Sequence, residues 1–218
     1  RGNKEKYYDN PNAWEKSETL LREFLQQRDC HYVEAEGEAA FYGPKIDVQM
    51  RNVNGKEDTA FTVQYDFCMP DRFDLTYIAE DGSEQRAFVV HRSSIGALER
   101  IMAFLIEKYA GAFPVWLSPV QAAILPISED AHGDYAQTIA DQLSEQKIRA
   151  ELHSDGSLGK RIRNAKQQKI PYLIIVGDTE KENSTITVEG RNELKLENIT
   201  AGEFIKRITT EINDRRDQ

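Results

Sequence analysis

Residues 88–109 constrain the fold more than any other stretch of the chain. The apolar run at 88–90 predicts a short buried strand. Beyond it, apolar residues recur at steps of three and four, which predicts a helix with one apolar stripe. They are Leu98, Ile101, Met102 and Leu105. Gly96 is predicted in the first turns of this helix, where glycine costs about 1 kcal/mol relative to alanine. We therefore expect another group to approach the backbone there.

The composition predicts a globular protein with a real core. Of 218 residues, 39% are hydrophobic and 30% are charged, which is enough for one large or two small domains. No apolar run approaches the roughly 20 residues that span a bilayer, and no signal peptide is evident, so no membrane contact is expected. Two cysteines form no disulfide framework and indicate reduced thiols in the cytoplasm. The net charge of −9 argues against a general nucleic-acid binder, so any RNA contact must come from a local basic patch.

The N-terminal part predicts a helix and an antiparallel sheet. Asn10-Pro11 can cap a helix that ends near Arg28. Apolar and polar residues alternate at 45–50 and again at 61–66, and Asn54-Gly55 between them is a strong hairpin signal. This alternation predicts an antiparallel sheet with one face on a core and one polar face.

The remainder of the chain alternates strands and helices. Residues 109–119 contain small residues and two prolines and predict a domain boundary. After it, strands and helices alternate, which predicts a small α/β domain with a mixed sheet. The helix at 158–169 is strongly basic, and such a run is usually a solvated face, although it also suits RNA phosphates. We therefore expect two domains, 1–113 and 114–218.

Three motifs resemble threonyl-tRNA synthetases, which belong to class II of the aminoacyl-tRNA synthetases. The first is His91-Arg92 followed by Ile95-Gly96 and Glu99-Arg100, which is similar to motif 3 of the class. The others are Tyr-Gly-Pro-Lys-Ile-Asp at 42–47 and Val-Gln-Tyr-Asp at 63–66. The resemblance covers essentially the whole chain. It implies the C-terminal part of a class II catalytic domain, with an antiparallel sheet and helices, followed by an anticodon-binding domain.

The resemblance also implies roles for residues of the polar sheet face. Tyr42, Lys45 and Gln64 correspond to residues that contact substrate or adenylate, and a lysine there would offset charge as pyrophosphate leaves. Asp47 and Asp66 are expected to orient the substrate amine or the lysine itself.

Three further positions follow from motif 3. By the same resemblance, Gly96 lets adenine lie against the helix, and Arg100 stacks on that adenine. His91 corresponds to one of three ligands of a zinc ion, whose other ligands would lie upstream.

A second set of residues is implied in anticodon recognition. Arg163 on the basic helix and Glu180 in the Gly-Asp-x-Glu turn match positions that read anticodon bases. The chain departs from the bacterial pattern at Asp155 and Lys169, where asparagine and arginine are common, and at Glu189, where arginine is common. Arg191 is a candidate substitute for the arginine missing near Glu189.

The implied function is threonine–tRNA ligation. ATP, with Mg²⁺, activates threonine, and the threonyl group passes to tRNA(Thr); zinc would select threonine over valine. Class motifs 1 and 2 are expected upstream, so this polypeptide is expected to be inactive alone, and the longer enzyme to be a homodimer. The alternative is a non-catalytic, synthetase-like tRNA-binding module. A prolyl or glycyl relative is disfavoured by His91 directly before Arg92 and by the run at 42–47.

Overall fold

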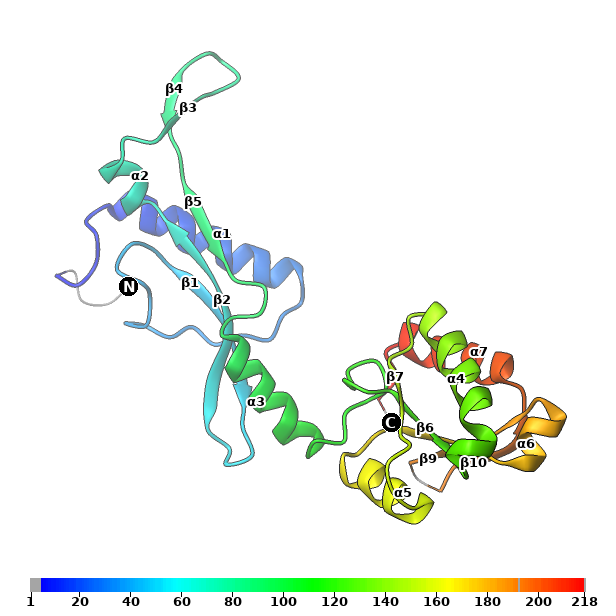
Figure 1. Cartoon of the computed structure of the whole chain (residues 1–218). Helices are drawn as coiled ribbons and strands as arrows, with labels where there is room; N and C mark the ends of the chain where they lie inside the picture. Colours follow the sequence, from blue (N-terminus) through cyan, green and yellow to red (C-terminus); the bar gives the residue numbers. More distant parts are fainter. Residues whose placement is uncertain (1–4, 192, 218) are drawn as a thin grey trace. The chain divides into compact units, whose positions relative to one another are not determined.

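A computed structural model describes residues 5–191 and 193–217 (Figure 1). The chain divides into two compact units, Arg1–Phe104 and Leu105–Gln218. This division falls inside helix α3 (Leu98–Tyr109). The domain boundary predicted after residue 113 stays a prediction. Among the described residues, no helix combines the length and apolar character needed to cross a bilayer.

Unit 1 is built on a three-stranded antiparallel sheet. Its order is β1 (Lys45–Arg51), β2 (Glu57–Asp66) and β5 (Val89–Arg92). The predicted hairpin turn is confirmed: Gly55 has φ +77°, and the Asn52 side chain accepts hydrogen bonds from the backbone N–H groups of Asn54 and Lys56. After β2 come the short helix α2 (Cys68–Arg72) and the hairpin of β3 (Thr76–Ile78) and β4 (Glu84–Arg86).

Helix α1 (Pro11–Gln27) packs on the sheet through its first turns only. Its start is confirmed, because the Asn10 side chain accepts from the N–H of Ala13 and proline occupies the first turn. Trp14 is buried, with its ring 5.2 Å edge-on from that of Phe67. The sequence also predicts an apolar face at Leu20, Leu21, Phe24 and Leu25, but Leu20 and Phe24 are exposed and Leu21 and Leu25 are only half-buried. That part of the prediction is wrong for the described chain, because no described element packs over it.

The stretch at 88–109 differs from expectation in three respects. Strand β5 lies at the sheet edge, so Val90 is exposed rather than buried. Helix α3 begins at Leu98, and Gly96 therefore precedes it in a turn with φ +73°. None of the residues in α3 is buried, and its stripe faces outward at Leu98 and Met102. Periodicity predicted the helix correctly but could not show whether anything covers it.

Unit 2 confirms the predicted mixed sheet. Its order is β10-β9-β8-β6-β7. The parallel strands are β6 (Ala122–Pro126), β7 (Ala150–Leu152) and β8 (Tyr172–Val176). The antiparallel strands are β9 (Ile186–Gly190) and β10 (Lys195–Ile199). Strand β6 is buried throughout because helices cover both of its faces, which explains its continuous apolar run.

The helices of unit 2 cover the sheet unequally. Helices α4 (Glu129–Glu145) and α7 (Ala201–Asn213) pack on one face and bury Leu143, Phe204 and Ile208. Helix α5 (Leu158–Gln167) packs on the other face over β6 and β8. Helix α6 (Asp178–Asn183) follows β8 and was not predicted, because its six residues are too short to show a period.

A buried tyrosine–carboxylate pair links β8 to α7. The hydroxyl of Tyr172 donates to Glu211 Oε2 at 2.6 Å, and the two residues are 3% and 9% exposed. Burial and this acceptor raise the pKa of Tyr172 to about 12. The neutral phenol is therefore favoured in the folded state.

Replacing Tyr172 by phenylalanine should lower the free energy of unfolding of unit 2 by about 1–3 kcal/mol at pH 7, because Glu211 loses a donor. A folded pKa above the unfolded value of about 10 means that the contribution of the tyrosine is complete below pH 10 and is lost as the pH rises towards 12. Urea unfolding of the wild type and of Tyr172→Phe between pH 7 and 12 measures this contribution to the free energy of unfolding. The stability difference should shrink between pH 10 and 12.

Tyr109→Phe is the control, because the Tyr109 hydroxyl donates to the exposed Asp217 at 2.9 Å. Its effect should stay below about 0.5 kcal/mol. An equal loss in both variants, or a difference that does not change with pH, would refute the role of the buried pair.

Candidate functional site

Three predicted site residues form a row across the sheet of unit 1. Lys45 on β1 lies directly opposite Gln64 on β2, and Gln64 lies opposite His91 on β5. Directly opposed residues project from the same face of a sheet. Helix α1 packs near Tyr65 and Phe67, which belong to the other face. The polar row is therefore left free of α1.

Neighbouring side chains hold two members of this row. The ammonium of Lys45 pairs with Asp47 Oδ2 at 2.5 Å, and both side chains are about one-fifth exposed, at 24% and 19%. The hydroxyl of Tyr42 donates to Gln64 Oε1. Burial, followed by the nearby charge of Asp66, raises the pKa of Tyr42, so the phenol remains a donor. The amide nitrogen of Gln64 is thereby free to point to a ligand.

Asp66 binds His91 rather than Lys45. Its Oδ1 accepts from the N–H groups of Cys68 and Met69, both at 2.9 Å, at the start of α2. Its Oδ2 lies 2.8 Å from His91 Nε2. Asp66 is 1% exposed, whereas the imidazole is 48% exposed and has the ring of Tyr42 5.7 Å away. One edge of the imidazole is thus fixed and the other is open.

Gly96 and Arg100 both contact β2, but at the strand's other end. A side chain at Gly96 would place Cβ 2.0 Å from the carbonyl oxygen of Ala60, so the group that approaches this glycine is the β2 backbone. Arg100 Nη1 donates to the carbonyl of Thr59 at 2.7 Å. At about 3.3 Å per residue, Thr59 and Gln64 are roughly 16 Å apart along the strand. Arg100 is exposed and accessible to a flat ligand.

The row supplies one potential metal ligand. Within residues 5–191 and 193–217, no group of three His, Cys, Asp or Glu side chains could hold a metal ion. His91 fits the role of a single ligand, because it is half-exposed and no described residue bonds its Nδ1. Cys30 and Cys68 are free thiols, exposed and buried respectively. A zinc site would therefore need ligands from outside this segment.

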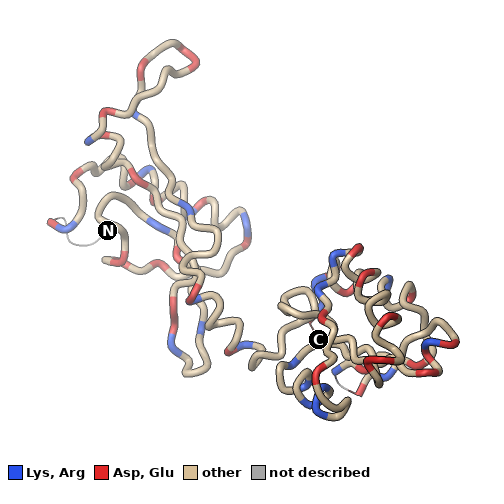
Figure 2. Tube along the Cα trace, viewed as in Figure 1, with Lys and Arg blue, Asp and Glu red and all other residues tan. Residues whose placement is uncertain are grey.

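In unit 2, two predicted anticodon residues, Asp155 and Glu180, lie at one edge of the sheet, and a third, Arg163, lies on α5. Asp155 follows β7 and Glu180 follows β8, so both lie at the carboxyl edge of the parallel strands. Glu180 accepts from the N–H of Gly177 at 3.0 Å and from the Thr187 hydroxyl at 2.8 Å. Arg163 is exposed on α5, where Figure 2 shows a concentration of basic positions.

The departure at residue 189 lies nearer the other end of the strands, because Glu189 is opposite Leu173 near the start of β8. Glu189 pairs with Lys166 of α5 at 3.3 Å, so this carboxylate partly offsets the basic helix. Sequence reasoning missed Thr187, which fixes the Glu180 carboxylate. The alternation of β9 was the available signal, since Thr187 and Glu189 share a face.

Lys169 and Arg191 lie at the opposite edge of that sheet. Arg191 follows Gly190, which pairs with Tyr172 at the start of β8. Arg191 Nη1 donates to the carbonyl of Phe113 at 2.6 Å, and Nη2 donates to that of Lys169. The ammonium of Lys169 in turn donates to the carbonyl of Ala110. Both cations thus bind backbone carbonyls and fix the segment before β6. They lie away from the edge that carries Asp155 and Glu180.

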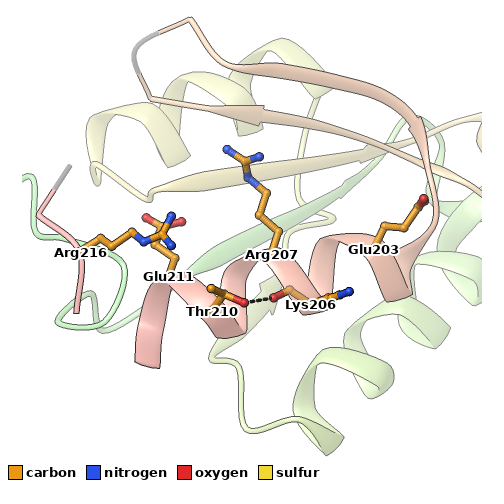
Figure 3. A pocket seen from close by; sticks show the side chains of 6 residues that line it. All are labelled: Glu203, Lys206, Arg207, Thr210, Glu211 and Arg216. Atoms are coloured by element: carbon orange, nitrogen blue, oxygen red, sulfur yellow. Dashed lines mark hydrogen bonds between the residues drawn. The ribbon is translucent and has the colours of Figure 1, made fainter. Parts of the chain in front are cut away.

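The surface of α7 carries a shallow hollow of about 360 Å³ (Figure 3). Its lining residues are Glu203, Lys206, Arg207, Thr210, Glu211 and Arg216. Several of its charges are already engaged. Glu203 accepts from Thr200, Glu211 accepts from Tyr172, and Arg216 pairs with Asp214 at 2.6 Å. The hollow contains none of the predicted site residues and is not a candidate site.

Comparison with known protein families agrees with the two units. Residues 4–109 match the tRNA synthetase class II core domain (G, H, P, S and T), and residues 121–211 match the anticodon binding domain. The antiparallel sheet of unit 1, the mixed sheet of unit 2 and these matches define a class II aminoacyl-tRNA synthetase segment.

Individual relatives show which synthetase of class II the chain is similar to. The chain is 48% identical over 210 residues to the threonine–tRNA ligase of Geobacillus sp. (strain WCH70) and 47% identical over 208 residues to threonine–tRNA ligase 1 of Bacillus subtilis. These alignments cover 96% and 95% of this chain but 33% and 32% of the relatives. The chain belongs to the threonyl-tRNA synthetase family and spans about a third of the length of these relatives.

Solved structures of threonyl-tRNA synthetases have the same fold as this chain. The RNA binding domain of threonyl-tRNA synthetase from Cryptosporidium parvum Iowa II superposes with a TM-score of 0.85 at 27% identity, covering 94% of this chain and 52% of that one. A putative threonyl-tRNA synthetase from Aeropyrum pernix superposes with a TM-score of 0.72 at 25% identity, covering 96% and 51%.

Proposed function

We propose that this chain is the C-terminal part of a threonine–tRNA ligase. The observation that carries the proposal is the row of Lys45, Gln64 and His91 on one open sheet face. A module that only bound RNA would not require a cation, an amide and an imidazole in this arrangement. We place the division between the catalytic part and the anticodon-binding part after residue 113, and the protein in the cytoplasm, where ATP, threonine and tRNA meet.

Each residue of the row has a role that follows from its contacts. Lys45, oriented by Asp47, would stabilise charge on the phosphates as pyrophosphate leaves. Tyr42 fixes the oxygen of Gln64, so the Gln64 N–H groups would bind the substrate. Arg100 would stack on adenine beside the turn at Gly96.

The metal and nucleotide parts of the proposal extend beyond this chain. His91 would be one ligand of a zinc ion, which would supply recognition of the amine and hydroxyl of threonine. Magnesium would accompany ATP. The remaining zinc ligands and the main contact of a homodimer would come from segments outside this chain.

The proposed RNA interface of unit 2 combines the carboxyl edge of its parallel strands with the exposed position of Arg163 on α5. Arg163, Asp155 and the fixed carboxylate of Glu180 would contact anticodon bases, which need hydrogen bonds to their edges. Their positions at one edge of the sheet and on α5 support this assignment.

ATP–pyrophosphate exchange by this chain and by a longer protein that contains it tests the proposal. The longer protein should exchange with threonine but not with valine, and the 218-residue chain should not exchange. Activity of the chain alone would overturn its status as an inactive part. An inactive longer protein that still binds tRNA(Thr) would establish the alternative, a non-catalytic tRNA-binding module.

Lys169 and Arg191 have a separate test, because their contacts indicate a structural role. Arg191→Ala should lower the free energy of unfolding of unit 2 by about 1–3 kcal/mol, since it removes two charge-assisted hydrogen bonds. The matched variant Arg163→Ala, at an exposed position, should change stability by less than about 0.5 kcal/mol and weaken binding of an anticodon stem-loop. If Arg191→Ala weakens RNA binding while unit 2 stays folded, Arg191 also belongs to the interface.

A further inference from the structure

We infer that Asp66 is a positioning residue that fixes the tautomer of His91 and leaves Nδ1 as its metal-binding atom. The inference deepens the proposed function and rests on it for the metal. It starts from a question that the sequence leaves open, namely which imidazole nitrogen is free. The nitrogen that carries the proton in a neutral histidine cannot bind a metal.

The surroundings of Asp66 decide the direction of the hydrogen bond. The carboxylate is 1% exposed, and its Oδ1 already accepts two backbone N–H groups, from Cys68 and Met69. A carboxylate has acceptor oxygens only. Its Oδ2, 2.8 Å from His91 Nε2, therefore accepts a hydrogen bond from an N–H at that nitrogen. The neutral imidazole therefore carries its proton on Nε2.

The other imidazole nitrogen is left open to a ligand. Nδ1 has no partner among the described residues, and the His91 side chain is 48% exposed. The strand register places His91 beside Gln64 on the open face, with the Tyr42 ring against it. A carboxylate that holds the far nitrogen of a metal-binding histidine orients the imidazole and increases its basicity. Asp66 has the position, the burial and the charge for this role.

Asp66→Asn gives a sharp test. The two backbone donors at Cys68 and Met69 would still require an oxygen, so the amide NH₂ group would face His91 Nε2. His91 would then carry its proton on Nδ1 and present N–H where the metal should bind. We expect ¹⁵N NMR of the neutral His91 imidazole in the 218-residue chain to show the Nε2–H form in the wild type. The variant should show the Nδ1–H form.

The matched control is Asp58→Asn, on the same strand, whose carboxylate accepts from Asn52 at 3.0 Å. It should leave the His91 spectrum unchanged. An Nδ1–H imidazole in the wild type overturns the inference without any variant. So does a tautomer that is the same in the wild type and in folded Asp66→Asn.

A second experiment tests the metal-binding role of the imidazole. It measures zinc affinity by chelator competition in a longer protein that contains this chain. Asp66→Asn should weaken zinc binding by about 10- to 100-fold, and Asp58→Asn should not. An inverted tautomer with unchanged zinc affinity would overturn the metal-positioning role. If the wild-type longer protein holds no zinc, the metal part of the proposed function fails and the positioning role fails with it. The NMR result would still report the Asp66–His91 bond separately.

Discussion

Gly96→Ala should destabilise unit 1 by about 3 kcal/mol or more. Two costs combine at this position. The backbone has φ +73°, which costs an alanine about 1–2 kcal/mol. The new Cβ would also lie 2.0 Å from the carbonyl oxygen of Ala60, so strand β2 or the turn before α3 must move. The displaced turn would carry Arg100 away from its contact at Thr59.

Urea unfolding in a Trp116→Phe background would measure this effect, because Trp14 is then the only remaining tryptophan and reports on unit 1. Gly82→Ala is the matched control: it has φ +79°, but no atom of the described residues lies within 4 Å of the added Cβ. Its free energy of unfolding should fall only by the cost of placing alanine at a positive φ, about 1–2 kcal/mol. If Gly96→Ala loses no more than Gly82→Ala, the close approach to Ala60 has no energetic consequence.

Lys45→Ala should slow threonine-dependent ATP–pyrophosphate exchange by about 10²- to 10³-fold in a longer protein that contains this chain. The ammonium is held at 2.5 Å by Asp47 and is only partly exposed, so it is oriented before a ligand binds. Removal of one oriented group that stabilises developing charge typically costs a factor of this size. The same substitution should lower the free energy of unfolding by about 1 kcal/mol at most, because the ion pair lies near the surface.

Two further variants separate charge from orientation. Asp47→Asn keeps the ammonium but loosens it, and a smaller fall in exchange is expected. Lys56→Ala, an exposed lysine beyond the hairpin turn, should leave exchange unchanged. Unchanged exchange in Lys45→Ala would remove this lysine from the chemistry. A loss that matches unfolding of the protein would make its role structural.

The predicted fold was most reliable where a local signal was sufficient. The cap at Asn10, the turn at Gly55 and the strands of unit 2 follow from side-chain chemistry and hydrophobic period, and the structure confirms them. Burial was predicted less well. The periodic stripes of α1 and α3 identify helices, but exposed Phe24 and Met102 show that period does not supply a covering partner.

The candidate site shows the same limit. The motifs identified Lys45, Gln64 and His91, and the hairpin signal indicated that two of them share a sheet. The register that aligns all three depends on the pairing of β2 with β5, which are separated by α2 and a second hairpin. The partners of Asp66, Lys169 and Arg191 could not be predicted, because each contact joins segments that are distant in sequence or depends on side-chain rotamers.

The sequence by itself determined the elements, the polar face of the hairpin and the family resemblance, because these depend on residue type and on spacing within a short window. Only the tertiary structure decided that Asp66 holds His91, that the β2 backbone approaches Gly96, and that Lys169 and Arg191 bind the carbonyls before β6. Those contacts are set by strand register and chain reversal, which bring together groups that no local pattern relates.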